Sequence, residues 1–433
     1  MADFDAIVVG AGCAGSVAAA VLAQEGKSVL LVERGEDAGA KNMTGGRLYA
    51  HALRAVFPDF EDDAPLERAI TNERITFMTD DESTTLSFCS PRLAGAATVS
   101  YAVLRGPFDQ WLAGRAEQAG AECVYGIAVE DFVWEGERVA GIQAGDDAIT
   151  ADVVIVADGA NSLLAEKAKL ATRPLPHQIA VGVKETIALP EQVISDRFQA
   201  AEGEGAAWLF AGAATHGHVG GGFIYTNHAS VSIGLVATLS DLCTSSVPVY
   251  QMMEDFKQHP TVAPLIRDGA LVEYSGHLIP EGGYDMVPTL YRDGCLVTGD
   301  AAMLCINLGY QVRGMDYAIA AGRIAAEATI EALDAGDTSA ARLASYRAKL
   351  EDSFVLKDLQ AYRRFPAFME GTPRMFSGYP EMAADIMRGM FSVDGAPVRS
   401  VKSTVLGPVK RTGMLYMLKA VRKGMQALCS PQP

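Results

Sequence analysis

A glycine-rich turn between two short apolar runs constrains this chain more than any other feature. Residues 6–9 form the first run and lead directly into Gly10, Gly12 and Gly15, after which small residues predict a helix to about residue 25. The first glycine permits a tight turn, the second lets backbone N–H groups approach a pyrophosphate, and the third lets the helix pack closely on the strand. The start of the helix then faces the negative charge. The pattern predicts a dinucleotide-binding unit.

An acidic residue at the end of the second apolar run supports the same prediction. Residues 29–32 end at Glu33, which lies roughly 20 residues beyond the glycines, where a carboxylate can accept hydrogen bonds from a ribose hydroxyl. Arg34 follows directly and is included in the expected site. A glycine-rich turn that binds nothing is the alternative, and the strand, helix and acid in register weigh against it.

Two loops in the first quarter of the chain fit a flavin dinucleotide. Gly45 and Gly46 would let the backbone lie against a flat ring system, and a helix is expected from Leu48. Arg105 stands just before an amphipathic helix and could bind a phosphate or the ribityl chain. The alternative for the two glycines is an ordinary turn. The alternative for Arg105 is a surface arginine at a helix end.

The middle of the chain supplies weaker signals. Two antiparallel strands are expected to turn at residues 135–137, and an apolar strand over 153–157 ends at Asp158–Gly159. This pair resembles the short second signature of many FAD enzymes, although it also makes common turns. Val129 is expected where the backbone meets an adenine edge, a feature that any strand valine could share.

The strongest late signal joins a strand end to a helix start. The strand over 295–298 leads to Asp300, whose carboxylate can hold ribityl hydroxyls. Gly314 and Met315 then open a long alanine-rich helix, whose first N–H groups can stabilise negative charge on a reduced flavin. No feature marks a covalent attachment, so the segments together predict non-covalent FAD.

These motifs resemble the FixC-type flavoproteins, relatives of the electron-transfer-flavoprotein:quinone oxidoreductases. Residues 41–49 and 309–316 are the most specific parts of a resemblance that runs over essentially the whole chain. It implies an α/β (α+β) fold of the para-hydroxybenzoate hydroxylase group, with a Rossmann-like FAD domain, an antiparallel-sheet substrate lobe and a helical C-terminal region. It also implies electron intake from an electron-transfer-flavoprotein-like heterodimer and delivery to quinone.

The expected domains are discontinuous along the chain. The FAD domain is expected to comprise residues 1–75, 100–175 and 286–345, the substrate or quinone lobe residues 76–99 and 176–285, and the helical region residues 346–433. Alternating apolar residues between 206 and 239 predict antiparallel strands in the lobe.

The seven cysteines are dispersed, which suggests a reducing compartment and matches no familiar zinc or iron–sulfur spacing. Mitochondrial-type relatives carry a four-cysteine cluster near the C-terminus, whereas only Cys429 lies beyond Cys305 here. A cluster must therefore come from a separate ferredoxin-like iron–sulfur subunit, or be absent. No metal site is predicted within the chain.

Residues that could act on a substrate are harder to identify. His216, His218 and His228 lie in a glycine-rich stretch, where a polar loop is favoured over a metal site, and the first two could protonate a quinone. Residues 365–391 are rich in methionine and aromatic side chains, which predicts internal packing first and a docking surface second. No catalytic residue can be assigned.

The net charge of -17 argues against nucleic acid as a partner, yet the C-terminus is basic. Seven basic residues and no acids follow Asp394, whereas residues 1–398 carry a net charge of -24. A helix over 414–428 would place one set of apolar residues within roughly a 100° arc and a basic set opposite. The arc comprises Met414, Met417, Leu418, Val421, Met425 and Leu428, and the polar set comprises Lys419, Arg422, Lys423 and Gln426.

Such a helix suits a membrane surface or an acidic partner, with ordinary packing on its own protein as the alternative. No signal peptide and no membrane span are recognised, so we expect a cytoplasmic protein held peripherally at the inner face of the cell membrane. The expected function is FAD-dependent electron transfer to membrane quinone within an electron-bifurcating complex. The alternatives are a stand-alone FAD reductase or hydroxylase of an isoprenoid or aromatic substrate, and a non-enzymatic flavin-binding subunit.

Overall fold

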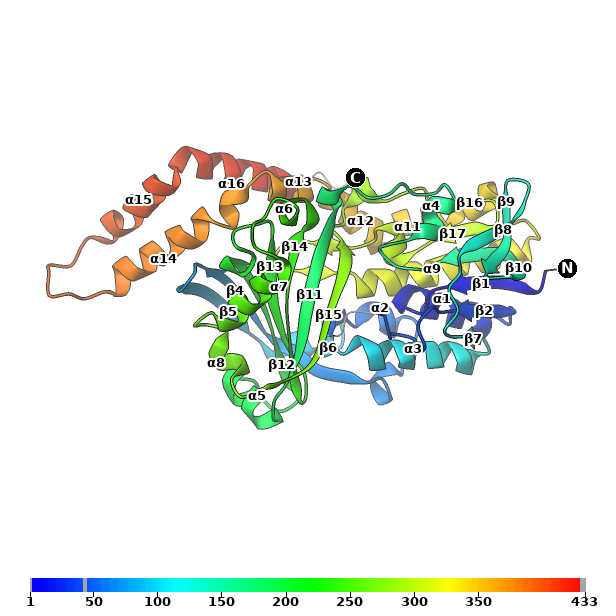
Figure 1. The fold of residues 1–433 in the computed structure, drawn as a ribbon, viewed down its shortest axis with the longest axis horizontal. Helices are drawn as coiled ribbons and strands as arrows, with labels where there is room; N and C mark the ends of the chain where they lie inside the picture. The colour runs from blue at the N-terminus through cyan, green and yellow to red at the C-terminus, as the bar shows by residue number, and fades with distance from the viewer. Residues whose placement is uncertain (1, 42–44, 429–433) are drawn as a thin grey trace.

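Two β-sheets organise the chain in the computed structural model, which describes residues 2–41 and 45–428 (Figure 1). The first sheet is parallel through its centre and has the order β16-β17-β10-β1-β2-β7, with the hairpin of β8 and β9 attached to β10. Its strands are β1 (Phe4–Val9), β2 (Val29–Val32), β7 (Glu122–Val124), β8 (Asp131–Glu135), β9 (Arg138–Ala144), β10 (Asp147–Val156), β16 (Tyr291–Arg292) and β17 (Cys295–Val297).

Helices cover this sheet because its central strands are apolar on both faces. The covering helices are α1 (Cys13–Gln24), α3 (Arg105–Ala119) and α9 (Met315–Asp334), with the short α2 (His51–Arg54) and α4 (Leu163–Lys167) at its margins. Small residues bring α1 and α9 close together, since a Cβ at Gly322 would lie 2.2 Å from the carbonyl oxygen of Ala14. The carboxyl ends of the parallel strands therefore meet at one edge, where open α/β sheets bind ligands.

The second sheet is antiparallel except where β12 runs parallel to β4, and its order is β15-β11-β14-β13-β12-β4-β6-β3, with β5 beside β4. Its strands are β3 (Gly46–Tyr49), β4 (Leu66–Met78), β5 (Ser83–Cys89), β6 (Ser100–Val103), β11 (Ile179–Ala188), β12 (Glu204–Gly212), β13 (Gly220–Thr226), β14 (Ser230–Thr238) and β15 (Ala270–Pro280). The helices α5 (Glu191–Phe198), α6 (Leu239–Leu242), α7 (Val249–Gln258) and α8 (Ala263–Ile266) accompany it. A separate core forms there around Phe198, Met252 and Phe256.

Two expectations for the first hundred residues differ from the structure. The helix expected from Leu48 is wrong, because residues 46–49 form strand β3 against β6 and the helix α2 begins only at His51. The expected domain boundary at residues 75/76 falls inside β4, a continuous strand of 13 residues. Strands β3 and β6 also belong to the second sheet, because backbone pairing extends that sheet beneath the first domain.

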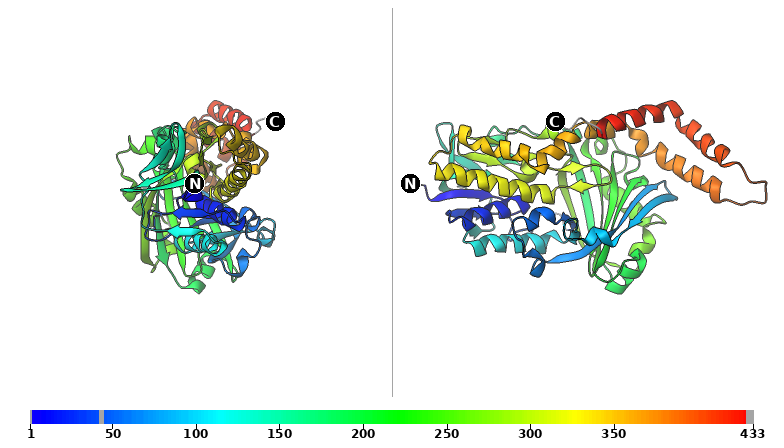
Figure 2. Two further views of the ribbon diagram at one scale, coloured as in Figure 1. Left: turned by 90° about the vertical axis from the view of Figure 1, so that its right-hand side faces the viewer. Right: turned by 180° about the vertical axis from the view of Figure 1, so that it is seen from behind.

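The C-terminal region is helical and includes a projecting hairpin of two helices. Its elements are β18 (Ile306–Asn307), β19 (Val312–Arg313), α10 (Ala340–Leu343), α11 (Ser345–Asp352), α12 (Phe354–Ala361), α13 (Phe365–Glu370), α14 (Gly378–Phe391), α15 (Val401–Thr412) and α16 (Met414–Leu428). Helices α14 and α15 pack together, α14 contacts β4 and β5, and the loop that joins the two helices projects from the body of the protein, as Figures 1 and 2 show. None of the described helices is both long and apolar enough to cross a membrane.

Candidate active site: a cavity between the two sheets

A cavity of about 1060 Å³ lies between the carboxyl edge of the first sheet and the inner face of the second. Twelve of the thirteen residues predicted for the cofactor site line it: Gly10, Gly12, Glu33, Arg34, Gly45, Gly46, Arg105, Val129, Asp158, Asp300, Gly314 and Met315. These residues come from segments as much as 305 positions apart in the chain. Gly15 is the exception, because it lies in α1 at the contact between that helix and β1.

The glycine-rich turn has the backbone geometry that its sequence demands. Gly10 has φ +104°, and a Cβ there would lie 2.4 Å from the carbonyl oxygen of Ala157. A Cβ at Gly15 would lie 1.9 Å from the carbonyl oxygen of Gly10, so this glycine lets α1 start close against β1. Gly12 precedes α1 directly, and the N-terminus of that helix opens toward the cavity.

The carboxylate of Glu33 is held rigidly at the end of β2. Its Oε2 accepts a hydrogen bond of 2.9 Å from the N–H of Ala11, and its Oε1 accepts one of 2.8 Å from the N–H of Gly35. Each carboxylate oxygen has a further lone pair for a ribose hydroxyl. Arg34 is exposed beside it at the same end of the cavity, and Val129 lies in the irregular segment between β7 and β8 rather than in a strand.

Two aspartates stand at neighbouring strand ends. The Oδ1 atom of Asp158 is buried and has no hydrogen-bond partner in the described part of the chain. Burial raises the pKa of Asp158 to about 6, against the lowering effects of Ser162, the Leu164 N–H and Arg34. Burial also raises the pKa of Asp300, while Arg105 and His277 oppose that shift. Both residues line the cavity, and Oδ1 of Asp158 keeps its hydrogen-bonding capacity free among the described residues.

Arg105 opens helix α3 and is fixed by a buried acid. Its Nε and one terminal nitrogen donate to the two carboxylate oxygens of Asp109 at 3.0 and 2.9 Å. Burial alone would lower the pKa of Arg105, but the Asp109 carboxylate outweighs it and the pKa is raised. Arg105 therefore presents a permanent positive charge to the cavity, rather than lying on the surface at a helix end.

A polar network that the sequence analysis missed holds the start of α9. The Oδ2 atom of buried Asp316 accepts from Nε of Arg313 at 2.8 Å and lies 3.1 Å from Nε2 of His51. Arg313 also donates to Asp358 at 2.7 Å, which accepts from the Tyr317 hydroxyl at 2.9 Å. The network fixes the backbone of Gly314 and Met315, so the helix N-terminus points into the cavity.

The wall opposite the glycine-rich turn carries a buried amine. Lys184 lies in the middle of β11, and a Cβ at Gly45 would lie 3.0 Å from its Nζ. Burial lowers the pKa of Lys184 well below its usual range, Arg105 lowers it further and Glu273 opposes the shift. His277 of β15 lines the same wall, and burial lowers its pKa too. The sequence contains one indication of this wall, because Lys184 interrupts the otherwise mostly apolar residues 179–188.

Beyond the residues predicted to bind the cofactor, the cavity becomes apolar. Its lining there comes from β12, β13 and the C-terminal region: Phe210, Phe223, Phe365, Pro366, Phe368, Met369, Met375, Phe376 and Leu428. The methionine-rich segment therefore contributes a cavity wall in addition to internal packing. Two acids, Glu281 and Glu370, also line this end.

The three histidines of the glycine-rich stretch lie outside the cavity. His216 pairs with Asp255 at 2.9 Å, His218 lies 3.9 Å from Asp241, and His228 lies 3.6 Å from Glu191. Each has a different carboxylate partner. Among the described residues no group of histidines, cysteines and acids is arranged to hold a metal ion.

The C-terminal helix packs through a different face from the expected apolar one. Ala420, Gly424 and Ala427 are buried, and a Cβ at Gly424 would lie 3.2 Å from the Phe368 ring. The predicted apolar arc is left largely uncovered, with Leu418 61% and Val421 56% exposed. The helix thus contacts its own protein with small residues and leaves both its large apolar and its basic side chains outside.

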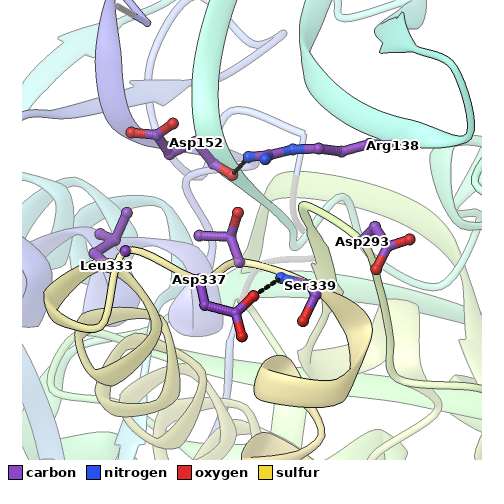
Figure 3. A pocket seen from close by; sticks show the side chains of 8 residues that line it. Arg138, Asp152, Asp293, Leu333, Asp337 and Ser339 are labelled. Carbon is purple, nitrogen blue, oxygen red and sulfur yellow. Dashed lines mark hydrogen bonds between the residues drawn. The ribbon is translucent and has the colours of Figure 1, made fainter.

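A smaller pocket lies at the opposite end of the first sheet (Figure 3). Its polar groups serve local structure: Arg138 donates to the Asp152 carbonyl, Asp293 accepts from the Ala340 N–H, and Asp337 accepts from the Ser339 N–H. It contains none of the residues predicted for the cofactor.

Comparison with known proteins identifies the family. Residues 5–173 and 90–328 match FAD dependent oxidoreductase families, and residues 365–428 match the ETF-QO/FixC family C-terminal domain. The chain is 51% identical to the probable electron transfer flavoprotein-quinone oxidoreductase YdiS of Escherichia coli K12, over 98% of this chain and 99% of that protein. The chain belongs to the ETF-QO/FixC family. Protein FixC of the same strain is likewise 51% identical over 98% of this chain and 99% of its own length.

Solved structures confirm the fold predicted for this ETF-QO/FixC member. The geranylgeranyl bacteriochlorophyll reductase-like protein Ta0516 of Thermoplasma acidophilum superposes with a TM-score of 0.71 at 19% identity, over 97% of this chain and 99% of that one. The probable FAD-dependent monooxygenase PqsL of Pseudomonas aeruginosa gives 0.60 at 16% identity, over 88% and 98%. The protein is an FAD-dependent oxidoreductase that transfers electrons, and FAD is its cofactor.

The residues present fit FAD. The glycine-rich turn leaves no room for side chains at Gly10, the N-termini of α1 and α9 both face the cavity, and the buried Oδ1 of Asp158 has no partner of its own among the described residues. Arg105 adds a fixed positive charge for the dinucleotide. The remaining apolar end is the space in which a second molecule could approach the flavin.

Proposed function

We propose that this protein takes electrons from an electron-transfer-flavoprotein-like heterodimer and passes them through FAD to a membrane quinone. The observation that carries the proposal is the continuation of one cavity from the FAD-binding residues into an end lined by phenylalanine and methionine. Ligand sites of this kind are mostly apolar with a few placed polar groups, which suits a quinone ring.

Bound FAD supplies the redox chemistry, accepting and releasing one or two electrons. Glu33 would hold the ribose, and Asp300 would hold the ribityl hydroxyls. The first N–H groups of α9 and the Lys184 amine would favour negative charge on the flavin ring system. The apolar end would bind the quinone ring and exclude water.

The projecting hairpin supports contact with a membrane surface. Its tip exposes Phe391, Val393 and Val398, which are 78%, 91% and 96% exposed, and Arg399 and Lys402 follow directly. An acidic body should be repelled by an anionic bilayer, so a basic segment with uncovered apolar residues is the part that such a bilayer tolerates best. Peripheral attachment there would bring the apolar end of the cavity toward the bilayer that holds the quinone.

The family and the cysteines indicate which proteins could exchange electrons with this chain. The six described cysteines are free and dispersed, and the sequence lacks the four-cysteine cluster of mitochondrial-type relatives. We propose that a separate ferredoxin-like iron–sulfur subunit supplies such a centre, and that the protein works within an electron-bifurcating complex.

Single-turnover oxidation tests the central proposal. The FAD-loaded chain, reduced without oxygen, should be oxidised rapidly by a soluble short-chain quinone and slowly by oxygen. Addition of the reduced heterodimeric flavoprotein should re-reduce it. Oxygen consumption driven by NAD(P)H with the isolated chain, without quinone reduction, would instead favour a stand-alone reductase or hydroxylase.

A further inference from the structure

A carboxyl group stands in the wall of the apolar end of the cavity. Glu281 follows β15 directly, and its backbone N–H donates to the carbonyl of Gln178 at 2.9 Å. The next residue, Gly282, has φ +74°, and a Cβ there would lie 2.2 Å from the carbonyl oxygen of Cys305. This close packing fixes the backbone, so Glu281 has a defined position against the cavity.

The partner of this carboxyl suits both of its protonation states. Thr238 Oγ1 lies 3.1 Å from Oε1 of Glu281 and 3.3 Å from the carbonyl oxygen of Val219. When Glu281 is ionised, the threonine hydroxyl can donate to it. When Glu281 is protonated, it can donate to the hydroxyl oxygen while the threonine proton turns to Val219. The site can therefore hold or release a proton without leaving a buried polar atom unpaired.

The surroundings favour the protonated form near neutral pH. Burial raises the pKa of Glu281 to about 7, the Thr238 hydrogen bond lowers it, and the charges of Glu370 and Asp241 raise it. The groups that face Glu281 are Thr238 of β14, Asp241 of α6, Glu370 at the end of α13 and the buried thiol of Cys305. No positive charge contributes to the Glu281 shift among the described residues.

Titratable groups on the outer side of this carboxyl reach solvent. Asp241 accepts a hydrogen bond of 2.9 Å from the Val219 N–H and lies 3.9 Å from Nδ1 of His218. The side chains of His218 and Asp241 are 27% and 32% exposed. A proton lost from Glu281 can thus be replaced from outside without crossing the flavin-binding end.

We propose that Glu281 is the acid that protonates the molecule reduced in the apolar end of the cavity, which is a quinone if the proposed function is correct. Glu281 would deliver one proton to a quinone oxygen, and the two electrons and the other proton that the quinone needs would come from reduced FAD. The two carbonyl π bonds are lost, two O–H bonds form, and Glu281 is left as a carboxylate. Solvent then returns its proton through the Asp241 and His218 side.

The test compares two oxidants of the reduced FAD-loaded chain in stopped-flow experiments. A short-chain quinone requires protons, whereas ferricenium accepts single electrons and requires none. We expect Glu281→Gln to slow oxidation by the quinone about 100-fold or more, the usual scale of general acid catalysis, and to leave oxidation by ferricenium within about twofold. Glu281→Asp should restore part of the quinone rate, and the exposed-site control Glu202→Gln should change neither.

The pH profile and an infrared measurement give further readouts. The quinone rate of the wild-type chain should fall as pH rises through about 7, and Glu281→Gln should remove this dependence. The infrared carbonyl band of a protonated carboxylic acid should disappear over the same range in the wild type and be missing from the variant.

Equal rates with quinone in Glu281→Gln and wild type would overturn the assignment. Equal slowing with both oxidants would also overturn it, because a general loss of structure affects both. If ferricenium oxidises the reduced wild-type chain and the quinone does not, the proposed function is wrong. The proposed role of Glu281 is then wrong too.

Discussion

At the scale of single residues, the site is made of charged groups placed where few internal partners compete for them. Glu33 and Arg105 are held by backbone N–H groups and by Asp109, whereas Asp158 and Asp300 turn carboxyl groups toward the cavity. A buried carboxyl oxygen without a partner is costly, so Asp158 Oδ1 indicates where a ligand could supply a hydrogen bond. We therefore expect the cofactor to supply the hydrogen bond that the chain leaves unmade at Asp158 Oδ1.

Replacing Asp300 by alanine should weaken FAD retention more than it destabilises the fold. Loss of a charged hydrogen bond costs about 1.5–3 kcal/mol, which is roughly ten- to a hundredfold in affinity. Flavin fluorescence titration of the FAD-free protein measures this directly. Asp152→Ala, an exposed carboxyl on β10 outside the cavity, is the control, and equal affinity in wild type and Asp300→Ala would reject the assignment.

The pKa of Asp158 predicts a pH-dependent stability. Its folded pKa of about 6 exceeds the ordinary value of 3.8, so the folded state binds the proton more tightly than the unfolded state. The associated stabilisation is present at low pH and is lost as pH rises from about 4 through about 6, by on the order of 3 kcal/mol. Asp158→Asn should remove this slope from urea unfolding of the FAD-free protein.

Bound FAD should reduce the same pH dependence, because a hydrogen bond donated to Asp158 Oδ1 stabilises the ionised form. An identical pH slope in wild type and Asp158→Asn would show that Asp158 is not buried as the structure has it.

At the scale of elements, contiguous sequence motifs predicted parts of the site, whereas the pairing of distant strands could not be predicted. The glycine-rich turn, the strand end at Asp300 and the helix start at Gly314 were predictable because each is a contiguous motif with its own backbone requirement. The opposite wall was not, because Lys184 and His277 meet the cavity only through the register of β11 with β15. Register depends on pairing between segments distant in the chain, which one sequence does not display.

The packed face of the C-terminal helix could not be predicted from the sequence either. Its periodicity correctly predicted a helix with apolar and basic sides, yet the packed face comprises Ala420, Gly424 and Ala427. Small residues give a weak hydrophobic pattern but allow close approach to Phe368. The larger apolar side chains are consequently available for an external surface.

Substitutions in the hairpin and in the last helix should separate membrane contact from folding. Neutralising Lys419, Arg422 and Lys423 with glutamine should weaken binding to anionic vesicles about 100-fold at low salt, because each basic residue near such a surface contributes about 1 kcal/mol. Phe391→Ser with Val398→Ser should lower the salt-resistant part of binding. Vesicle sedimentation at two salt concentrations measures both.

The matched control neutralises Arg173, Arg267 and Lys349 on the body of the protein and should leave vesicle binding unchanged. Truncation at Gly413 is a poorer test, because Ala427 belongs to the main core and Leu428 lines the cavity. Vesicle binding that resists all of these substitutions would place the contact elsewhere.

At the scale of the whole molecule, FAD would join the two sheets. The expected cofactor residues belong mainly to the first sheet, whereas Gly46, Lys184 and His277 close the cavity from the second. A ligand that binds only the folded state stabilises it by about 2.7 kcal/mol at a hundred times its Kd. Because FAD bound in this cavity would contact both sheets, its removal should lower the Tm of the entire molecule and loosen the contact between them.

Purified protein should therefore be yellow, release FAD on acid precipitation and unfold at a lower temperature once FAD is removed. Re-addition of FAD should restore the Tm in a concentration-dependent way, and FMN should restore little, because it lacks the adenosine that Glu33 and Val129 are expected to contact. Hydrogen exchange should show the largest loss of protection at the cavity-lining ends of β1, β10 and β11. Flavin that remains with the precipitate, or equal rescue by FMN, would contradict a non-covalent dinucleotide spanning both sheets.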